Sequence, residues 1–336
     1  MKRGLAIAVC CTIAAVVQAQ DSDPFFAGRS QLLLDPSRAG FSPGARITLL
    51  HQDQFLQFPG AWRSDVINAE WCARNTKKTV RSWLGIGFNV MRDRQGLLGS
   101  RSSSIGVMPA IHLRTGQRTF LSTGIEIRWV DHVFGDATGA WGSQYDGTRY
   151  DAGIASGEER TAATRRFVEA RAGLSWTLKR DAESARRRER DLLVLGVAAD
   201  HVGQLVVQDD GLPTSPIPVR MTAYILGESP HEIWDDGFFA GEVIGHMQGP
   251  FHTGRVNIYA GKHTLNKVRA TGGPLLLGFK AGVGYRFRDA LLVNAAVDVG
   301  RTTFGVAYGW SVVNVDTYAS GRRTFELLLQ LRPFDG

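Results

Sequence analysis

Apolar and polar side chains alternate along many short segments of this chain. Leu84, Ile86, Phe88 and Val90 are apolar, and the residues between them are glycine or asparagine. The longest alternating segment runs from Leu275 to Phe287. A period of two is typical of a β-strand with one apolar face. No comparable stretch has the i, i+3, i+4 spacing of a long amphipathic helix, so the pattern predicts an all-β protein.

The length of these segments separates a membrane barrel from a soluble β-sandwich, which also alternates. A strand that crosses lipid at a tilt needs about 9–11 residues, and the segment from Pro274 to Arg288 is long enough. Backbone polar groups in lipid must all be paired, so such a sheet must close. The sequence therefore predicts a transmembrane, antiparallel, up-and-down β-barrel of about 14 strands. The predicted strands begin near Arg46, Trp62, Val80, Ser103, Gln117, Arg165, Asp191, Val219, Phe238, Arg255, Leu275, Leu291, Thr303 and Arg322.

An even strand number places both chain ends on the same side of the membrane, and we expect this side to be the periplasm. The long connections Asp131 to Thr164 and Gly203 to Pro218 then lie at the cell surface. The short connections Arg114 to Gln117 and Gly300 to Thr302 lie on the periplasmic side. Long outer loops and short inner turns are the expected asymmetry.

The N-terminus has the pattern of a secretory signal peptide. Lys2 and Arg3 precede an apolar run from Leu5 to Val17, and cleavage is expected near Ala19/Gln20. The apolar run is shorter than a transmembrane helix requires. We therefore expect three parts: a signal peptide at 1–19, an N-terminal segment entering the barrel at 20–45, and the outer-membrane barrel at 46–336.

Charge and cysteine content narrow the possible partners. After removal of Lys2 and Arg3 the chain has 37 basic and 32 acidic residues, a formal charge of +5. The charges are scattered, whereas nucleic-acid binding usually requires a clustered basic stripe. Cys72 is the only cysteine of the mature chain, so no internal disulfide can form.

No residue set in the sequence indicates catalysis, a metal or a cofactor. The eight histidines are dispersed, and no Gly-x-Ser-x-Gly nucleophile motif occurs. Asp-Gly pairs such as Asp146-Gly147 do not continue into a calcium loop, and they are ordinary turn sequences. We expect a protein that is not an enzyme, and a barrel hydrolase is the least favoured interpretation.

Basic residues on one predicted strand raise the question of a pore. Lys280, Arg286 and Arg288 are candidates to line the lumen, where they could make an anion-selective channel. The alternative, which we favour, is a charge network that fills the pore with acids such as Glu326, Glu169 or Asp298.

Several segments in order along the mature chain resemble the PorP/SprF outer-membrane proteins of the type IX secretion system. The first is Asp35-Pro36-Ser37-Arg38-Ala39-Gly40, which is similar to the family's Asn-Pro-Ala-x-x-Gly element. The series continues with Gln52-Asp53-Gln54-Phe55 and is clearest at Leu84 to Asp93. Later segments that fit are Ala172 to Trp176 and Leu195 to His201.

The resemblance implies an outer-membrane barrel of Bacteroidetes-type bacteria that acts in protein secretion or gliding motility. Its expected partners are the C-terminal domain of a secreted cargo protein or adhesin, a periplasmic peptidoglycan-associated protein, and outer-membrane lipid. The family carries no known catalytic residues. Trp141, Tyr145 and Tyr150 in the long outer connection are the candidate partner-binding residues, since exposed aromatic side chains dominate interface energetics. The alternative function is a diffusion channel or small-molecule transporter.

Overall fold

The computed structural model describes residues 23–57, 60–72, 81–96, 99–135, 142–155, 163–179, 191–210, 216–230, 237–267, 274–312 and 322–334. The predicted signal peptide and Trp141 lie outside these residues. The strands are β1 (Gly44–Gln54), β2 (Trp62–Cys72), β3 (Ser82–Gln95), β4 (Ser100–Arg114), β5 (Thr119–Phe134), β6 (Ala163–Lys179), β7 (Asp191–Asp200), β8 (Gln204–Asp209), β9 (Arg220–Pro230), β10 (Gly237–Gln248), β11 (Phe251–Lys267), β12 (Pro274–Arg286), β13 (Ala290–Val299), β14 (Thr302–Ser311) and β15 (Arg323–Phe334). The helical elements are α2 (Gln31–Leu34), η1 (Pro36–Arg38) and η2 (Gly142–Gln144).

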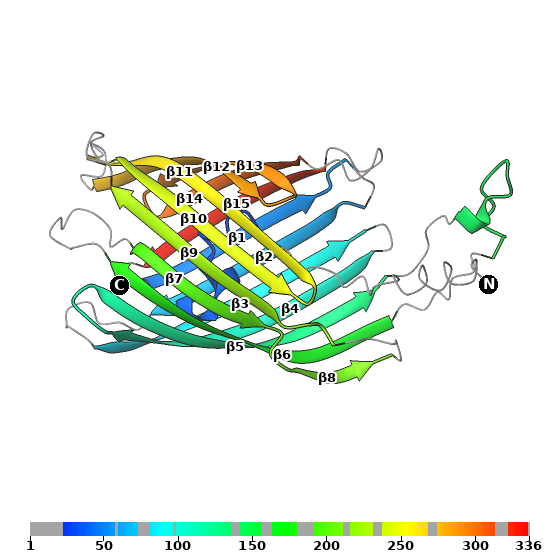
Figure 1. Cartoon of the computed structure of the whole chain (residues 1–336), viewed down its shortest axis with the longest axis horizontal. Coiled ribbons are helices and arrows are strands. Elements are labelled where there is room, and N and C mark those ends of the chain that lie inside the picture. Colours follow the sequence, from blue (N-terminus) through cyan, green and yellow to red (C-terminus); the bar gives the residue numbers. More distant parts are fainter. Residues whose placement is uncertain are drawn as a thin grey trace, which may run out of the picture.

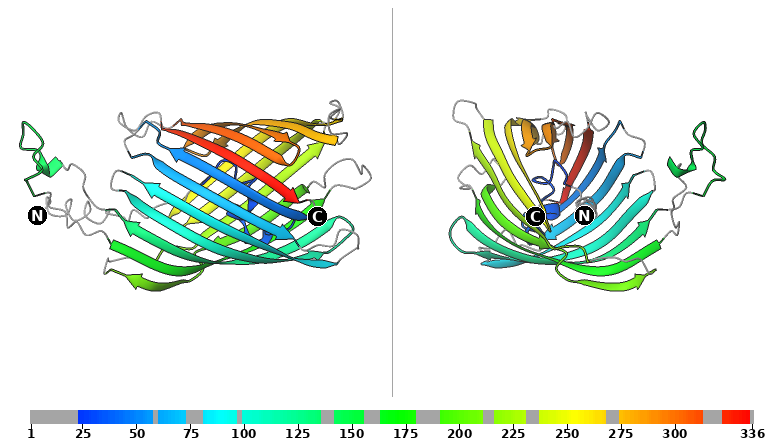
Figure 2. Two further views of the ribbon diagram at one scale, coloured as in Figure 1. Left: turned by 180° about the vertical axis from the view of Figure 1, so that it is seen from behind. Right: turned by 45° about the vertical axis from the view of Figure 1, so that its right-hand side comes forward.

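These strands form one closed antiparallel barrel (Figures 1 and 2). Each strand pairs with its neighbours in sequence except around β8, which pairs with β6 while β7 pairs with β9, and β15 closes the sheet by pairing with β1. The barrel has 14 crossings, because β7 and β8 together make one of them. The predicted barrel of about 14 strands is confirmed, and each crossing begins no more than four residues from its predicted start.

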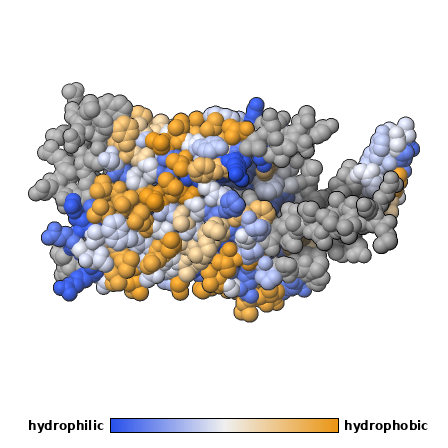
Figure 3. All heavy atoms as spheres, viewed as in Figure 1, coloured by the Kyte–Doolittle hydropathy of each residue, from blue (hydrophilic) through white to orange (hydrophobic). Residues whose placement is uncertain are grey.

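The two faces of the wall differ as lipid requires. Inward positions are buried, whereas large apolar side chains such as Leu84, Ile105, Ile258 and Val283 point outward and are 57–65% exposed. Apolar side chains cover much of the strand surface seen in Figure 3. An outward apolar face around a closed sheet is typical of a barrel whose solvent is the bilayer. No helix in the described part of the chain is long and apolar enough to cross a membrane.

The two ends of the barrel can be told apart by their connections. We call the end with the long connection between β5 and β6 the loop end. The opposite end, where Gly44 begins β1 and β15 finishes, we call the terminal end. Under the predicted topology the loop end faces the cell exterior.

One crossing is broken between β7 and β8. His201 and Gly203 have left-handed backbone angles, with φ of 60° and 85°. After this break the chain pairs with the loop-end half of β6, while β9 pairs with β7. The far edge of β8 pairs with no other strand among the described residues. Figure 1 shows β8 at the margin of the barrel, beside β6.

The residues before β1 lie inside the barrel. The segment 23–43, which we call the plug, includes α2 and η1 and crosses the interior as an irregular chain (dark blue in Figure 2). Side chains from Phe25 to Ala27 and from Asp35 to Phe41 are almost completely buried. The N-terminal segment expected to enter the barrel therefore fills much of its centre.

Inward-facing glycines make room for the plug backbone. A Cβ atom at Gly124 of β5 would lie 2.5 Å from the carbonyl oxygen of Pro36. At Gly85 of β3 it would overlap the Ala39 carbonyl, and at Gly173 of β6 it would overlap the Asp35 carboxylate. Three strands thus lack side chains where the plug touches the wall, through its backbone at Gly124 and Gly85 and through the Asp35 side chain at Gly173.

Gly124→Ala should therefore destabilise the protein by roughly 1–3 kcal/mol, the usual cost of overpacking a close contact. The free energy of unfolding, measured by urea titration in lipid vesicles, tests this. Gly241→Ala on β10 is the matched control, because its nearest atom, the Asn257 carbonyl oxygen, would be 3.9 Å away. Equal stabilities for the two variants would contradict close packing of the plug.

Candidate functional site

Apolar contacts between the plug and the wall make up the core. Phe25 and Phe26 pack with Leu50, Leu292 and Leu328 near the loop-end half of the wall. The other three buried clusters also contain plug residues. The second cluster includes Ala27 and Leu34, the third includes Leu32 and Ala39, and the fourth includes Phe41. Every apolar cluster found among the described residues thus joins the plug to the barrel wall.

The segment that resembles the family element forms a tight turn in the plug. The Asp35 carboxylate accepts a 2.7 Å hydrogen bond from the Ser37 backbone N–H, and this caps η1. Its other oxygen accepts a 2.8 Å bond from the Tyr224 hydroxyl on β9. At the end of the turn Gly40 has φ of 62°, a conformation that favours glycine. The element therefore fixes the chain direction where the plug meets the wall.

Inward polar side chains of the wall bond to the backbone of the plug. Glu326 of β15 is fully buried, and its carboxylate accepts hydrogen bonds of 2.6 and 2.8 Å from the backbone N–H groups of Phe25 and Phe26. Glu70 of β2 accepts from the Gly40 N–H at 2.8 Å. An irregular segment has no ladder to pair its backbone, so the wall supplies the partners.

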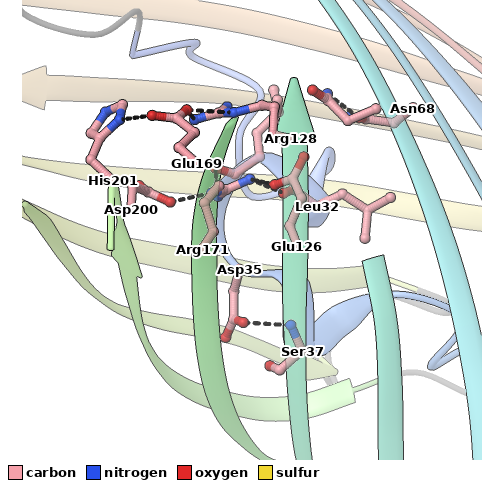
Figure 4. Close-up of polar contacts among 12 residues, drawn as sticks. Leu32, Asp35, Ser37, Asn68, Glu126, Arg128, Glu169, Arg171, Asp200 and His201 are labelled. Carbon is pink, nitrogen blue, oxygen red and sulfur yellow. Dashed lines mark hydrogen bonds and ion pairs between the residues drawn. The ribbon is translucent and has the colours of Figure 1, made fainter. Parts of the chain in front are cut away.

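Arg171 of β6 lies at the centre of a buried charge network (Figure 4). Its guanidinium donates to Glu126 of β5 at 2.7 Å and also to Asp200 of β7. It also donates to the carbonyl oxygens of Leu32 and Leu33 in the plug, at 3.3 and 3.0 Å. One arginine thus links three strands and the plug.

A second group continues this network toward the loop end. Glu169 of β6 accepts from Arg128 of β5 and lies 2.6 Å from the Nδ1 atom of His201 (Figure 4). His201 directly follows β7 and has a left-handed backbone conformation. The network therefore reaches the break between β7 and β8. All three side chains are at least 85% buried, and they tie the break to the wall.

The four lumen candidates occupy different places. Glu326 binds the plug, as described above. Lys280 lies 3.8 Å from Glu242 and 3.6 Å from the centre of the Tyr259 ring, beside a cavity of about 220 Å³. Arg286 pairs with Asp289 at 2.5 Å and lies 3.9 Å from Asp23 of the plug. Arg288 follows β12 in an exposed turn with φ of 55°.

Lys280, Arg286 and Arg288 are therefore not gathered along one open channel surface. We expected the basic residues to meet acids such as Glu326, Glu169 or Asp298. Lys280 and Arg286 lie beside Glu242 and Asp289 instead. Asp298 lies instead 3.4 Å from Arg29 of the plug.

Two of the three partner-binding candidates lie in a small structured loop. Tyr145 and Tyr150 form an isolated antiparallel bridge and are 56% and 47% exposed. Backbone N–H groups of Arg149 and Thr148 donate to Asp146 and hold its pKa below the ordinary value. Figure 1 shows this loop beyond the loop end, away from the barrel wall. The loop thus has internal order, and its aromatic rings remain accessible.

Sequence reasoning expected residues 20–45 to enter the barrel and named Glu326, but it did not predict how this segment packs or most of the wall residues that bind it. Arg171, Glu126 and Glu70 are ordinary polar positions of alternating strands, and nothing local distinguishes them. A usable signal did exist in the plug itself, because Phe25, Phe26 and the run from Leu32 to Leu34 are apolar residues placed before the first strand.

A closed barrel with an apolar outer face and a lumen filled by its own N-terminal segment defines a plugged outer-membrane barrel. The family described as "Type IX secretion system membrane protein PorP/SprF" matches residues 17–186. The chain belongs to this family, whose members are components of type IX secretion at the outer membrane.

One solved structure supports the fold at a TM-score of 0.50, and two others are similar at lower scores. The chain resembles the deltaS2S3 mutant of the monoaromatic hydrocarbon channel TodX, with 11% identity, a TM-score of 0.50, and coverage of 90% of this chain and 94% of that one. The monoaromatic hydrocarbon channel CymD is 13% identical over 94% of this chain and 95% of that one, with a TM-score of 0.46. A FadL homologue from Pseudomonas aeruginosa is 11% identical, covers 89% of this chain and 94% of its own, and has a TM-score of 0.44. No curated protein sequence matches.

Arg171→Ala should lower the free energy of unfolding by about 3–5 kcal/mol, because it leaves two buried carboxylates without their cation. It should also release the plug, so residues 23–43 should become sensitive to added protease in the folded barrel. Arg166→Ala is the control, since that arginine is 43% exposed in its pair with Asp131. An Arg171→Ala protein with wild-type stability and a protected plug would contradict the linking role.

Proposed function

We propose that this barrel recognises the C-terminal domain of a secreted cargo protein or adhesin at its loop end and holds it at the cell surface. A periplasmic peptidoglycan-associated protein would be met at the terminal end. The barrel would act by binding protein partners, without catalysis and without passing small molecules.

The observation that carries this proposal is the filled lumen. The plug packs against β1. Side chains of several other strands form hydrogen bonds with it, and these strands include β2, β3, β4, β6, β9, β11 and β15. Buried polar groups that are hydrogen-bonded to one another are costly to separate. A wide diffusion path would require the plug to leave, so the filled lumen supports partner binding over the channel alternative.

Two surfaces at the loop end support recognition of a protein. The ordered loop presents Tyr145 and Tyr150, and aromatic rings of this kind are frequent anchors of interfaces. The free edge of β8 carries Leu205, Val206 and Val207, which are 69%, 41% and 56% exposed. An exposed apolar strand edge can add a strand of another chain. Both surfaces lie at the loop end, where a partner held at the cell surface would contact the barrel.

Single-channel recording tests the closed lumen. Purified wild-type protein in a planar bilayer should give no steady conductance, whereas a variant lacking residues 23–41 should conduct. The deletion variant is the positive control, because it shows that the recording can detect an open barrel of this size. Steady, anion-preferring current through the wild-type protein would favour the diffusion channel instead.

Deletion of residues 136–160 tests the recognition site. A fluorescent protein fused to a type IX C-terminal domain should lose surface retention in cells with this variant, because the binding loop is gone. The double variant Tyr145→Ala/Tyr150→Ala should weaken retention several-fold if the rings are anchors. A deletion of residues 313–320 at the same end is the control, and heat-modifiable gel migration verifies assembly. Unchanged retention after the 136–160 deletion would refute this site.

A further inference from the structure

A cluster of arginines lies on the outer surface of the barrel, on the side of the wall that faces the membrane. Arg63 of β2, Arg94 of β3 and Arg101 of β4 stand directly opposite one another across these neighbouring strands. All three occupy outward positions and are exposed. Arg92 lies two residues along β3 on the same face and is also exposed. We call these four residues the arginine cluster.

The register of the strands gives the height of the arginine cluster on the wall. Ile67, Val90 and Ile105 are paired across the same three strands, and their apolar side chains are 42–57% exposed. Arg92 lies two residues beyond this apolar row toward the loop end, and Arg94 lies four residues beyond it. Two residues of strand span about 7 Å along its axis. The cluster therefore begins just past the apolar band, at the depth of lipid headgroups.

The chain neutralises only part of this charge. Arg63 donates to Asp53 at 2.9 Å. Asp65 of β2 stands directly opposite Arg92, and its carboxylate lies 2.6 Å from the Nδ1 atom of His51. The guanidinium groups of Arg92, Arg94 and Arg101 form no hydrogen bond or ion pair with the part of the chain that the structure describes. Like charges placed directly opposite one another on a sheet are destabilising. Such an arrangement is favourable when an anion lies between the guanidinium groups.

We propose that the arginine cluster binds the phosphorylated headgroup of an outer-leaflet lipid. Guanidinium groups bind phosphate through two parallel N–H donors, which suits a phosphate held among three arginines. The cluster faces outward above the apolar band, so the anion that it meets in the membrane is a lipid phosphate. The site includes neither the edge of β8 nor the lumen. The inference is therefore independent of the proposed cargo binding.

Native mass spectrometry of the full-length mature barrel with diphosphorylated lipid A tests the proposal. Wild-type protein should retain lipid A, and the double variant Arg94→Gln/Arg101→Gln should bind it on the order of tenfold more weakly, given the effect of each basic residue at an anionic surface. Arg94→Lys/Arg101→Lys should bind more tightly than the glutamine variant because it keeps the charge. Dephosphorylated lipid A should bind wild type as weakly as lipid A binds the glutamine variant.

The matched control is Arg149→Gln/Arg288→Gln, which removes two exposed arginines outside the arginine cluster. It should bind lipid A within about twofold of wild type, since these residues lie in loop-end connections. Wild-type affinity in Arg94→Gln/Arg101→Gln, or an equal loss in the control, would overturn the proposal. The melting temperature should rise more with lipid A than with inorganic phosphate at the same concentration. An equal rise would also overturn the proposal, since the site would then bind free anions.

Discussion

The structure depends on the pairing of buried polar groups between the barrel wall and the plug. An irregular segment inside a barrel has backbone groups that no strand ladder pairs, and a buried inward-facing carboxylate or guanidinium is removed from bulk water. Glu326 and Arg171 solve both problems together, because each binds plug backbone groups. The plug and the inner wall therefore stabilise each other.

The strand pattern could be read from the sequence because lipid imposes it. Outward positions within the hydrocarbon must be mostly apolar, so a period of two marks the crossings, and the fourteen predicted segments correspond to the fourteen crossings. The break at His201–Gly203 did not alter the count, since β7 and β8 follow one another along β6. The break itself could not be predicted, because a left-handed histidine has no local sequence signal beyond the glycine two residues later.

The interior was harder to predict because its contacts are distant in sequence. Phe25 and Phe26 bind a carboxylate about three hundred residues away, and Arg38 bonds to Thr177. No periodicity records such pairs. The lumen candidates show the same limit, since alternation placed Lys280 and Arg286 on the inner face but could not identify the acids beside them. Arg288 differs because the strand ends before it.

The two faces of the wall leave little freedom for function at the middle of the barrel. Inward positions there bind the plug, and outward positions meet lipid chains. Residues can take on other tasks only beyond the apolar band, where neither demand applies. The exposed aromatic loop, the free edge of β8 and the arginine cluster all lie toward the loop end beyond that limit. The same physical constraint that makes the barrel predictable thus confines the proposed recognition surfaces to the rim.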